Sequence, residues 1–374
     1  MKIGITCYPT YGGSGIVATE LGIYLARAGH EVHFISYAIP FRLNRYQDNL
    51  FFHEVEVLDY PVFQYPPYSL ALASKLVEVA EFADLELIHA HYAIPHATSA
   101  CLAKQILERD KLRVVTTLHG TDITLVGQHP SFKRTVQFSI NHSDGVTAVS
   151  EYLARETYLA FSIEKEISVI PNFIPTSFLK LQDKPVKVRN LKANDKLTIC
   201  HISNFRPLKR VKDIVQIVER LKNRFPVHVL MVGDGPERSI MEHLVHEKGL
   251  AKLFTFLGKQ DSVIDILEKS DLFLLPSGDE SFGLAALEAM ACGVPCITSD
   301  AGGLPEVNID GKTGFVVSVG QIDQYIQSIS LLHSDEALRL QFAKNAKEHA
   351  FKNFHPDIIT PQYLAFYQKV LKAE

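Results

Sequence analysis

Three cationic side chains lie close together in the segment 203–210, directly after an apolar run of strand length. Arg binds phosphate oxygens through two parallel hydrogen bonds and Lys adds a point charge, so Arg206, Lys209 and Arg210 would suit a pyrophosphate. Asn204 stands in the same loop. The alternative interpretation is a solvated loop that carries ordinary surface charge.

Two carboxylates mark the segment 279–290. We expect Glu280 in a loop and Glu288 on the following helix, where apolar neighbours would bury it. A buried carboxylate needs a polar partner, and sugar or ribose hydroxyls would provide one because hydroxyls donate strongly to carboxylates. An ordinary capping acid accounts for Glu280 but not for the whole segment. The backbone N–H groups of Phe282, Gly283 and Leu284 have no helical partner at the helix start, so they could bind an anion.

Glycine-rich loops follow apolar runs at two other places. Gly12 to Gly15 opens the first predicted helix, and Gly233 and Gly235 precede a later one. Backbone N–H groups at such helix starts can face an anion, but a tight turn that needs glycine conformations explains each loop as well. The first loop is neither the G-x-G-x-x-G dinucleotide fingerprint nor a P-loop.

A histidine follows the fourth apolar run, in the segment 116–122. His119 lies there beside glycine and hydroxyl residues, at a strand terminus, where parallel sheets usually bind their ligands. Most histidines are structural, so the residues alone leave both roles open. His89, His91 and His96 suggest a metal site, but no matching carboxylate lies near them in the sequence, and we predict no bound metal.

Length and charge restrict the class of protein. The 374 residues suffice for two domains of ordinary size. With 38 Lys and Arg against 42 Asp and Glu, the net charge of -4 provides no general attraction for nucleic acid or for an anionic membrane. The odd number of cysteines, five, favours free buried thiols in a reducing cytoplasm. No stretch reads as a secretory signal or a membrane span.

Apolar runs alternate with helix-period segments from end to end, the pattern of parallel α/β sheets with buried strands. We predict two Rossmann-like, doubly wound α/β domains that face each other across a cleft. The predicted strands are 3–7, 31–36, 87–89, 114–118 and 145–149, then 197–202, 227–232, 253–257, 272–275 and 296–299. The predicted helices are 15–28, 70–82, 97–108 and 150–161, then 211–224, 237–247, 282–291, 337–353 and 356–372.

Together the motifs resemble the retaining GT-B glycosyltransferases of family 4, over nearly the whole chain. The motifs are 12–15, 119–122, Arg206 with Lys209, 233–237, 280–288 and 302–306. A narrower resemblance is to the branch of this family that transfers N-acetylglucosamine to L-malate in bacillithiol biosynthesis. It is carried by 3–9, 39–44, 65–68, 91–96 and 201–206.

The resemblance implies UDP-GlcNAc as a donor substrate, held mainly by the second domain, and no cofactor. Glu288 would bind the ribose, Glu280 the donor sugar hydroxyls, and His119 the sugar near the reacting carbon. Many relatives have Gly-Arg where this chain has Ser203-Asn204, so Arg206 would supply that cation. The implied catalytic residues are His119, Glu280, Arg206 and Lys209. The implied donor-binding residues are Gly13, Asn204, Arg210, Gly235, Ser281, Phe282, Gly283, Leu284 and Glu288.

The resemblance also implies L-malate as the acceptor, bound by the first domain. Retention would follow front-face attack, in which the departing β-phosphate oxygen takes the acceptor's proton, so neither an enzymic base nor a metal is needed. The cations would stabilise the leaving diphosphate. Malate carries two carboxylates, so its pocket needs hydrogen-bond donors and cations. The candidates are Ser14, Tyr92, Thr117 and Thr121 as donors, with Arg42 and Arg134 as cations.

A polar stretch without a clear period, 176–195, is expected to be the linker. Members of the family return their last helix to the first domain. We therefore place the acceptor-binding domain at residues 1–170 with 356–374, and the nucleotide-sugar-binding domain at 176–355. The hinge would lie near 170–176 and 355–356.

Other functions stay open from the residues alone. They are the same donor chemistry on an inositol phosphate, a lipid or a polysaccharide, a nucleotide-sugar sensor without turnover, and a UDP-GlcNAc epimerase. A lipid acceptor should come with a basic amphipathic helix face, and the first domain shows no obvious one. We expect a cytoplasmic enzyme with small-molecule substrates, no nucleic acid partner and no stable membrane association. Homo-oligomerisation is left open.

Overall fold

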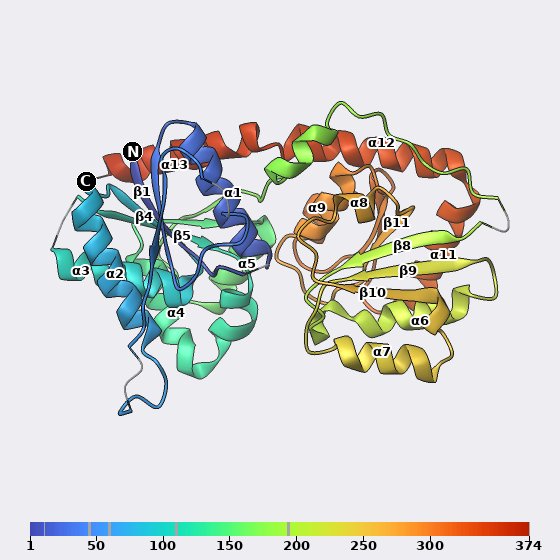
Figure 1. The fold of residues 1–374 in the computed structure, drawn as a ribbon, viewed down its shortest axis with the longest axis horizontal. Helices are drawn as coiled ribbons and strands as arrows, with labels where there is room; N and C mark the ends of the chain where they lie inside the picture. The colour runs from blue at the N-terminus through green and yellow to red at the C-terminus, as the bar shows by residue number, and fades with distance from the viewer. Residues whose placement is uncertain (11, 44–45, 59–60, 109–110, 193–194, 374) are drawn as a thin grey trace. The chain divides into compact units, whose positions relative to one another are not determined.

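The structure, a computed structural model, describes residues 1–10, 12–43, 46–58, 61–108, 111–192 and 195–373. It divides into two compact units, Met1–Phe173 with Pro356–Glu374, and Ile174–His355 (Figure 1). The predicted domain ranges differ from these units only at residues 171–175. Asn44 of the motif 39–44 and residues 193–194 of the predicted linker lie outside the described residues.

A seven-stranded parallel sheet forms the N-terminal unit, in the order β3-β2-β1-β4-β5-β6-β7. Its strands are β1 Lys2–Thr6, β2 Glu31–Ser36, β3 Leu50–Glu54, β4 Leu87–His91, β5 Arg113–Leu118, β6 Gly145–Ala148 and β7 Ile167–Val169. Its helices are α1 Gly13–Arg27, α2 Tyr68–Ala83, α3 Thr98–Leu107, α4 Pro130–His142, α5 Glu151–Ala160 and the C-terminal α13 Pro356–Lys372. Helix α13 packs its Tyr363 and Tyr367 into the same core as β1 and β2, so the end of the chain completes this unit.

The C-terminal unit repeats the plan with a six-stranded parallel sheet, in the order β10-β9-β8-β11-β12-β13. Its strands are β8 Leu197–Ile202, β9 Val227–Val232, β10 Phe254–Gly258, β11 Leu272–Leu275, β12 Cys296–Ser299 and β13 Gly314–Val317. Its helices are α6 Val211–Leu221, α7 Arg238–Glu247, α8 Ile264–Leu267, α9 Leu284–Ala291, α10 Leu304–Val307, α11 Ile322–Ser334 and α12 Glu336–Asn353. The predicted doubly wound α/β class is therefore confirmed for both units.

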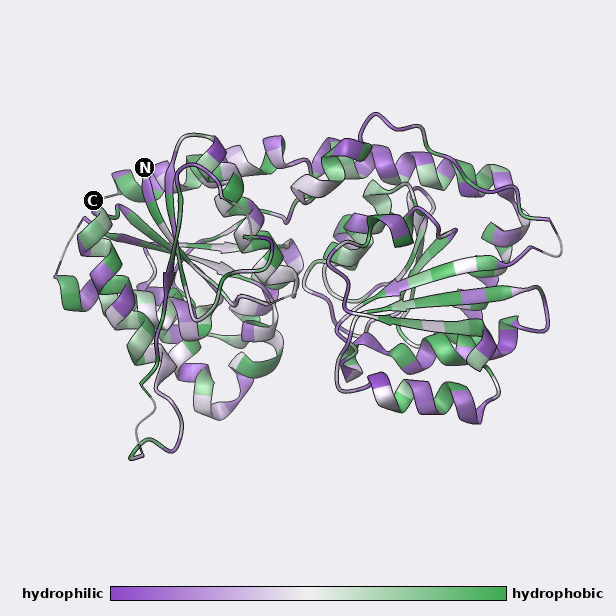
Figure 2. Ribbon diagram, in the orientation of Figure 1, coloured by the Kyte–Doolittle hydropathy of each residue, from purple (hydrophilic) through white to green (hydrophobic). Residues whose placement is uncertain are grey.

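Hydropathy explains why these segments form these elements. Strands β8 and β9 are largely apolar, whereas α6 and α7 carry apolar and polar residues on different faces (Figure 2). In α6 the buried residues Val211, Ile214, Val215 and Val218 follow the three-to-four-residue period of a helix that packs one face on a sheet. Within the described residues, no helix is long and apolar enough to cross a membrane.

Several elements escaped the sequence prediction. Strand β3 is an edge strand with every residue at least partly exposed, so it lacks a continuous apolar run. Strand β7 has only three residues, and the polar helix α4 has only three buried residues. Strand β13 and helices α8, α10 and α11 were also not predicted.

The prediction of a linker is wrong in one respect, because the described residues of this segment pack against the C-terminal unit. Phe178 and Leu181 are buried, and the buried Lys347 of α12 donates hydrogen bonds to the carbonyls of Leu181 and Lys184. The side chains of this segment are largely polar, so the sequence resembles a linker. The hydrogen bonds that fix it to α12 are accepted by backbone carbonyls, which the sequence pattern does not reveal.

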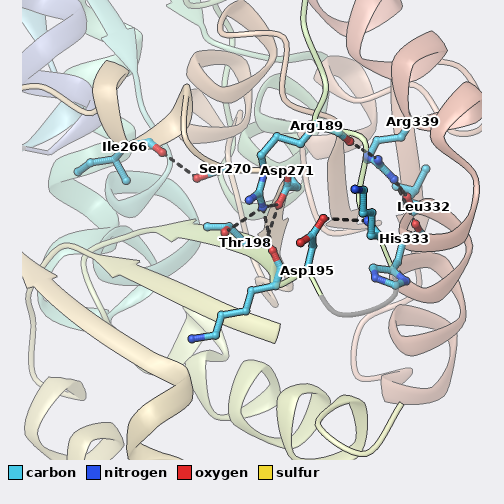
Figure 3. Close-up of polar contacts among 11 residues, drawn as sticks. Arg189, Asp195, Thr198, Ile266, Ser270, Asp271, Leu332, His333 and Arg339 are labelled. Atoms are coloured by element: carbon cyan, nitrogen blue, oxygen red, sulfur yellow. Dashed lines mark hydrogen bonds and ion pairs between the residues drawn. The ribbon is translucent and has the colours of Figure 1, made fainter. Parts of the chain in front are cut away.

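Arg189, further along this segment, pairs with Asp271 at the start of β11, and its carbonyl accepts a hydrogen bond from Arg339 at 2.7 Å (Figure 3). The guanidinium of Arg339, on α12, also donates to the carbonyls of Leu332 and His333. Only 1% of the Arg339 surface is exposed. A buried arginine with three carbonyl acceptors therefore joins α11, α12 and the segment that enters β8.

Replacement of Arg339 with Met should lower the free energy of unfolding by about 3 kcal/mol, because buried carbonyls lose their donors. Chemical denaturation of the intact chain measures this. Arg224→Met is the matched control, since Arg224 is exposed and donates only one long hydrogen bond, to Ser330. Equal unfolding midpoints for the two variants would contradict the assigned role.

Candidate functional site

In each unit, two of the predicted motifs lie where the order of the strands reverses, and the others follow the neighbouring strands β5, β9 and β12. The reversal falls between β1 and β4 in the N-terminal sheet and between β8 and β11 in the C-terminal sheet. Open parallel sheets bind ligands in the crevice beyond the strand ends at this point. The glycine loop follows β1 and Tyr92 follows β4, while the cationic loop follows β8 and the loop of Glu280 follows β11.

A buried histidine supports the cationic loop of the C-terminal unit. His201 in β8 places Nδ1 at 2.9 Å from the Leu274 carbonyl and Nε2 at 2.8 Å from Ser203 Oγ. The carbonyl can only accept, so Nδ1 carries the proton and the Ser203 hydroxyl donates to Nε2. Ser203 Oγ in turn accepts the Phe205 N–H at 3.3 Å. The sequence analysis included His201 in the motif 201–206 but assigned it no role.

Two glycines allow neighbouring loops to approach the cationic loop and the Glu280 loop. A Cβ on Gly235 would lie 1.9 Å from the Asn204 carbonyl oxygen, and a Cβ on Gly302 would lie 1.9 Å from the Glu280 carbonyl oxygen. The adjacent Gly303 N–H donates to that same carbonyl of Glu280 at 2.8 Å. The predicted motif 233–237 therefore packs against the cationic loop, and the predicted motif 302–306 packs against the Glu280 loop.

The structure brings Lys209 and Glu280 together. Lys209 Nζ lies 2.5 Å from Glu280 Oε1, which also accepts a hydrogen bond from Ser277 at 3.1 Å. Each side chain of the pair is 14% exposed. A cation and a carboxylate thus share one partly buried position at the ends of β8 and β11, where a ligand with both phosphate and hydroxyl groups could contact both.

The other cations of the loop differ from each other. Arg206 is exposed. Arg210 pairs with Asp213 in the first turn of α6, at 2.7 Å, and Asn204 is exposed beside this loop. Arg210 is thus already neutralised by its own helix, whereas Arg206 is the cation of this loop that remains on the surface.

The helix after Glu280 begins later than predicted, at Leu284, with Gly283 as its N-cap at φ 97°. Glu288 lies on this helix and is 6% exposed, as expected. Phe282 is buried against Phe354, with ring centroids 5.7 Å apart, so its side chain anchors the helix start. Ser281 is half-buried at the preceding turn.

In the N-terminal unit, His119 lies just beyond β5 and is 7% exposed. The buried carboxylate of Asp122 accepts the backbone N–H groups of His119, at 3.2 Å, and Gly120, at 3.0 Å. It also accepts the Ala93 N–H, at 2.9 Å, from the turn after β4. Burial raises the pKa of Asp122 to about 6, so it remains a carboxylate at neutral pH. Asp122 therefore joins the two strand ends that carry His119 and Tyr92.

Three acceptor candidates, Ser14, Tyr92 and Thr121, and the donor candidate Gly13 lie just beyond strands β1, β4 and β5. Tyr92 has φ 87° and its ring centroid lies 5.2 Å from that of His119, and Thr121 is half-buried in the adjoining turn. Gly13 and Ser14 form the start of α1, after β1. Ser14 and Tyr92 thus lie at the strand ends that flank the reversal point, and Thr121 follows the neighbouring strand β5.

For Thr117 the predicted contact is wrong. Thr117 lies inside β5 with 0% exposure, and its hydroxyl is hydrogen-bonded to His89 and to Thr147, each at 2.7 Å. The alternation of side chains along a strand places it beneath the site, where it supports the strand ends.

The two predicted cations of this unit are not brought together. Arg42 forms an ion pair with the buried Glu20 of α1 at 3.0 Å, so its charge is already paired. Arg134 is exposed on α4.

Three histidines near the site, His89, His91 and His119, are hydrogen-bonded to one another or to hydroxyl groups. Tyr367 lies 2.7 Å from His89 Nδ1, and His91 Nδ1 lies 2.8 Å from His119 Nε2. In the part of the chain that the structure describes, no group of three or more His, Cys, Asp or Glu side chains is arranged to hold a metal ion. The five cysteines are free.

Comparison with known families covers both units. The model described as Glycosyltransferase Family 4 matches residues 11–178, and the model described as Glycosyl transferases group 1 matches residues 183–349. The N-acetyl-alpha-D-glucosaminyl L-malate synthase of Bacillus anthracis is 47% identical over 374 residues, which cover 100% of this chain and 98% of the relative.

Two solved structures share the fold. Sucrose-phosphate synthase from Thermosynechococcus elongatus superposes with a TM-score of 0.79 at 21% identity and covers 100% of both chains. Anabaena HepE in complex with UDP-glucose gives a TM-score of 0.79 at 22% identity, over 99% of this chain and 100% of that one. With the full-length identity to the Bacillus anthracis protein, these matches show that the chain belongs to the family 4 glycosyltransferases of GT-B fold.

Proposed function

We propose that the protein transfers N-acetylglucosamine from UDP-GlcNAc to the hydroxyl of L-malate, with retention of the anomeric configuration and without a metal ion. The observation that carries this proposal is the 47% identity, over the full chain, to a relative named for that reaction. Both sets of loops at the strand reversals contain the residue types that the reaction needs.

In the C-terminal unit, Lys209 and Arg206 would stabilise the diphosphate as it leaves, because fixed cations act on charge that develops in the transition state. Glu280 would accept hydrogen bonds from the donor sugar hydroxyls while it holds Lys209 in place. Glu288 would bind the ribose, and the N–H groups at the start of α9 would face the phosphates.

In the N-terminal unit, His119 would bind the sugar near the reacting carbon. Ser14, Tyr92 and Thr121 would donate to the malate carboxylates. The bond from the anomeric carbon to the β-phosphate oxygen breaks, the bond to the malate oxygen forms on the same face, and the malate proton passes to the departing phosphate oxygen. This balance uses neither an enzymic base nor a metal.

The direct test is release of UDP from UDP-GlcNAc in the presence of L-malate, compared with other hydroxy acids, an inositol phosphate and no acceptor. We expect rapid release with malate, an α-configured product by NMR, and the same rate after treatment with a chelator. Faster release with another acceptor would refute malate, a changed sugar without acceptor would indicate an epimerase, and binding without release would indicate a sensor.

A further inference from the structure

Two hydrogen-bonded histidines lie edge to edge at the ends of β4 and β5. His91 Nδ1 lies 2.8 Å from His119 Nε2, and the ring centroids are 5.1 Å apart with an interplanar angle of 26°. His91 is fully buried, whereas His119 keeps 7% of its surface exposed. One ring therefore faces the interior and the other reaches the surface where we place the sugar.

Both rings are neutral near pH 7. Burial lowers the pKa of His119 to about 3 and lowers that of His91 well below its usual value. The adjacent rings of His89 and His96 further disfavour a positive charge on His91. Each neutral ring carries one proton, so one histidine of the pair donates the shared hydrogen bond and the other accepts it.

The ring nitrogen of His91 outside the shared hydrogen bond, Nε2, indicates which histidine is the donor. Nε2 of His91 is buried and has no hydrogen-bond partner among the described residues. Buried N–H groups without an acceptor are rarer in proteins than acceptors without a donor. The proton of His91 therefore belongs on Nδ1, which donates to His119 Nε2, and the proton of His119 belongs on its own Nδ1.

The surroundings hold this pair in place. The ring of His89 lies 4.3 Å from that of His91 and is itself bonded to Thr117 and Tyr367. On the His119 side, Asp122 accepts the backbone N–H, as described above. A turn of either ring would break the hydrogen bond between His91 Nδ1 and His119 Nε2.

We propose that His91 is a positioning residue that fixes His119 in the tautomer with the proton on Nδ1, so that His119 presents a hydrogen-bond donor to a substrate oxygen. Such an oxygen is a sugar hydroxyl or a phosphate oxygen, both of which accept. The role in turnover rests on the proposed function, but the tautomer itself does not.

The tautomer can be observed directly. Histidine-selective ¹⁵N labelling of the intact protein, with the His119 signals assigned from their loss in His119→Ala, reports which ring nitrogen carries the proton. We expect Nδ1 of His119 to be protonated and Nε2 to be unprotonated. A proton on Nε2 of His119 in the wild-type protein would overturn the proposal, whatever the activity shows.

Three substitutions of similar size at position 91 distinguish the effect of losing the hydrogen-bond donor from the effect of altered packing. His91→Asn retains a donor near the position of Nδ1, His91→Leu has neither donor nor acceptor, and His91→Asp in its ionised form can only accept. We expect kcat within about three-fold of wild type for His91→Asn and a loss of about ten-fold for His91→Leu, the size of one ordinary hydrogen bond. His91→Asp should lose at least as much, with the proton of His119 shifted to Nε2.

The KM for UDP-GlcNAc should change little in all three variants, because the donor is held mainly by the C-terminal unit. His33→Leu is the matched control, since His33 is also a buried histidine of this sheet, on β2. Its kcat should equal that of wild type. A His91→Leu variant with the wild-type tautomer and kcat would also overturn the proposal. If the protein showed the expected tautomers but transferred no sugar to malate, the proposed function would be refuted. The assignment of His91 as donor to His119 would still stand.

Discussion

Replacement of Glu280 with Ala should lower kcat/KM for the nucleotide-sugar donor about a thousand-fold, the largest effect that we expect from a single side chain. Two losses combine. The sugar hydroxyls lose their acceptor, and Lys209 loses the carboxylate that lies 2.5 Å from its ammonium group. Removal of one partner of a largely buried ion pair leaves the other charge uncompensated, so the ammonium group of Lys209 would no longer be held where we place the diphosphate.

Initial rates of UDP release over a range of donor concentrations measure this loss. Glu280→Gln, which keeps the shape and one acceptor oxygen, should lose about a hundred-fold. Glu219→Gln is the matched control, because Glu219 also pairs with a lysine of the same unit, Lys248 at 2.8 Å, but on the surface of α6. Its kinetics should not change.

A double-mutant cycle with Lys209→Ala separates the two losses. If Glu280 acts partly through Lys209, the double variant should be less impaired than the product of the single effects. Glu280→Ala kinetics within three-fold of wild type would remove Glu280 from the site.

His119→Ala should lower kcat about a hundred-fold and leave the KM for UDP-GlcNAc within about three-fold. An interaction made near the reacting carbon is strongest in the transition state, so its removal affects turnover more than ground-state binding. Steady-state kinetics with both substrates varied provide the measurement. His142→Ala, an exposed histidine at the end of α4 in the same unit, should behave as wild type.

The opposite pattern, a raised KM with unchanged kcat, would contradict the placement of His119 beside the reacting carbon. Comparison of His119→Ala with His91→Leu adds a second constraint. Because His91 acts through His119, its removal in the background of His119→Ala should have no further effect on kcat.

The sequence by itself determined the class of fold and the motifs. The central strands are largely buried, so they appear as mainly apolar runs of strand length, and the helices between them show one apolar side. Edge and short elements such as β3 and β7 lack this signal, and both were missed. The burial of Glu288 could be predicted because its neighbours on one helix are apolar.

Only the tertiary structure decided which motifs meet. Lys209 and Glu280 are 71 residues apart, and they pair because β11 lies beside β8 in the sheet. His91 and His119 meet because β4 and β5 pair with His91 opposite Thr117, which brings the ends of the two strands together. The same pairing buries Thr117, which the sequence placed in contact with the acceptor. Local periodicity determines how each segment folds, whereas strand order and register depend on how all the segments pack around one core, and no local pattern encodes them.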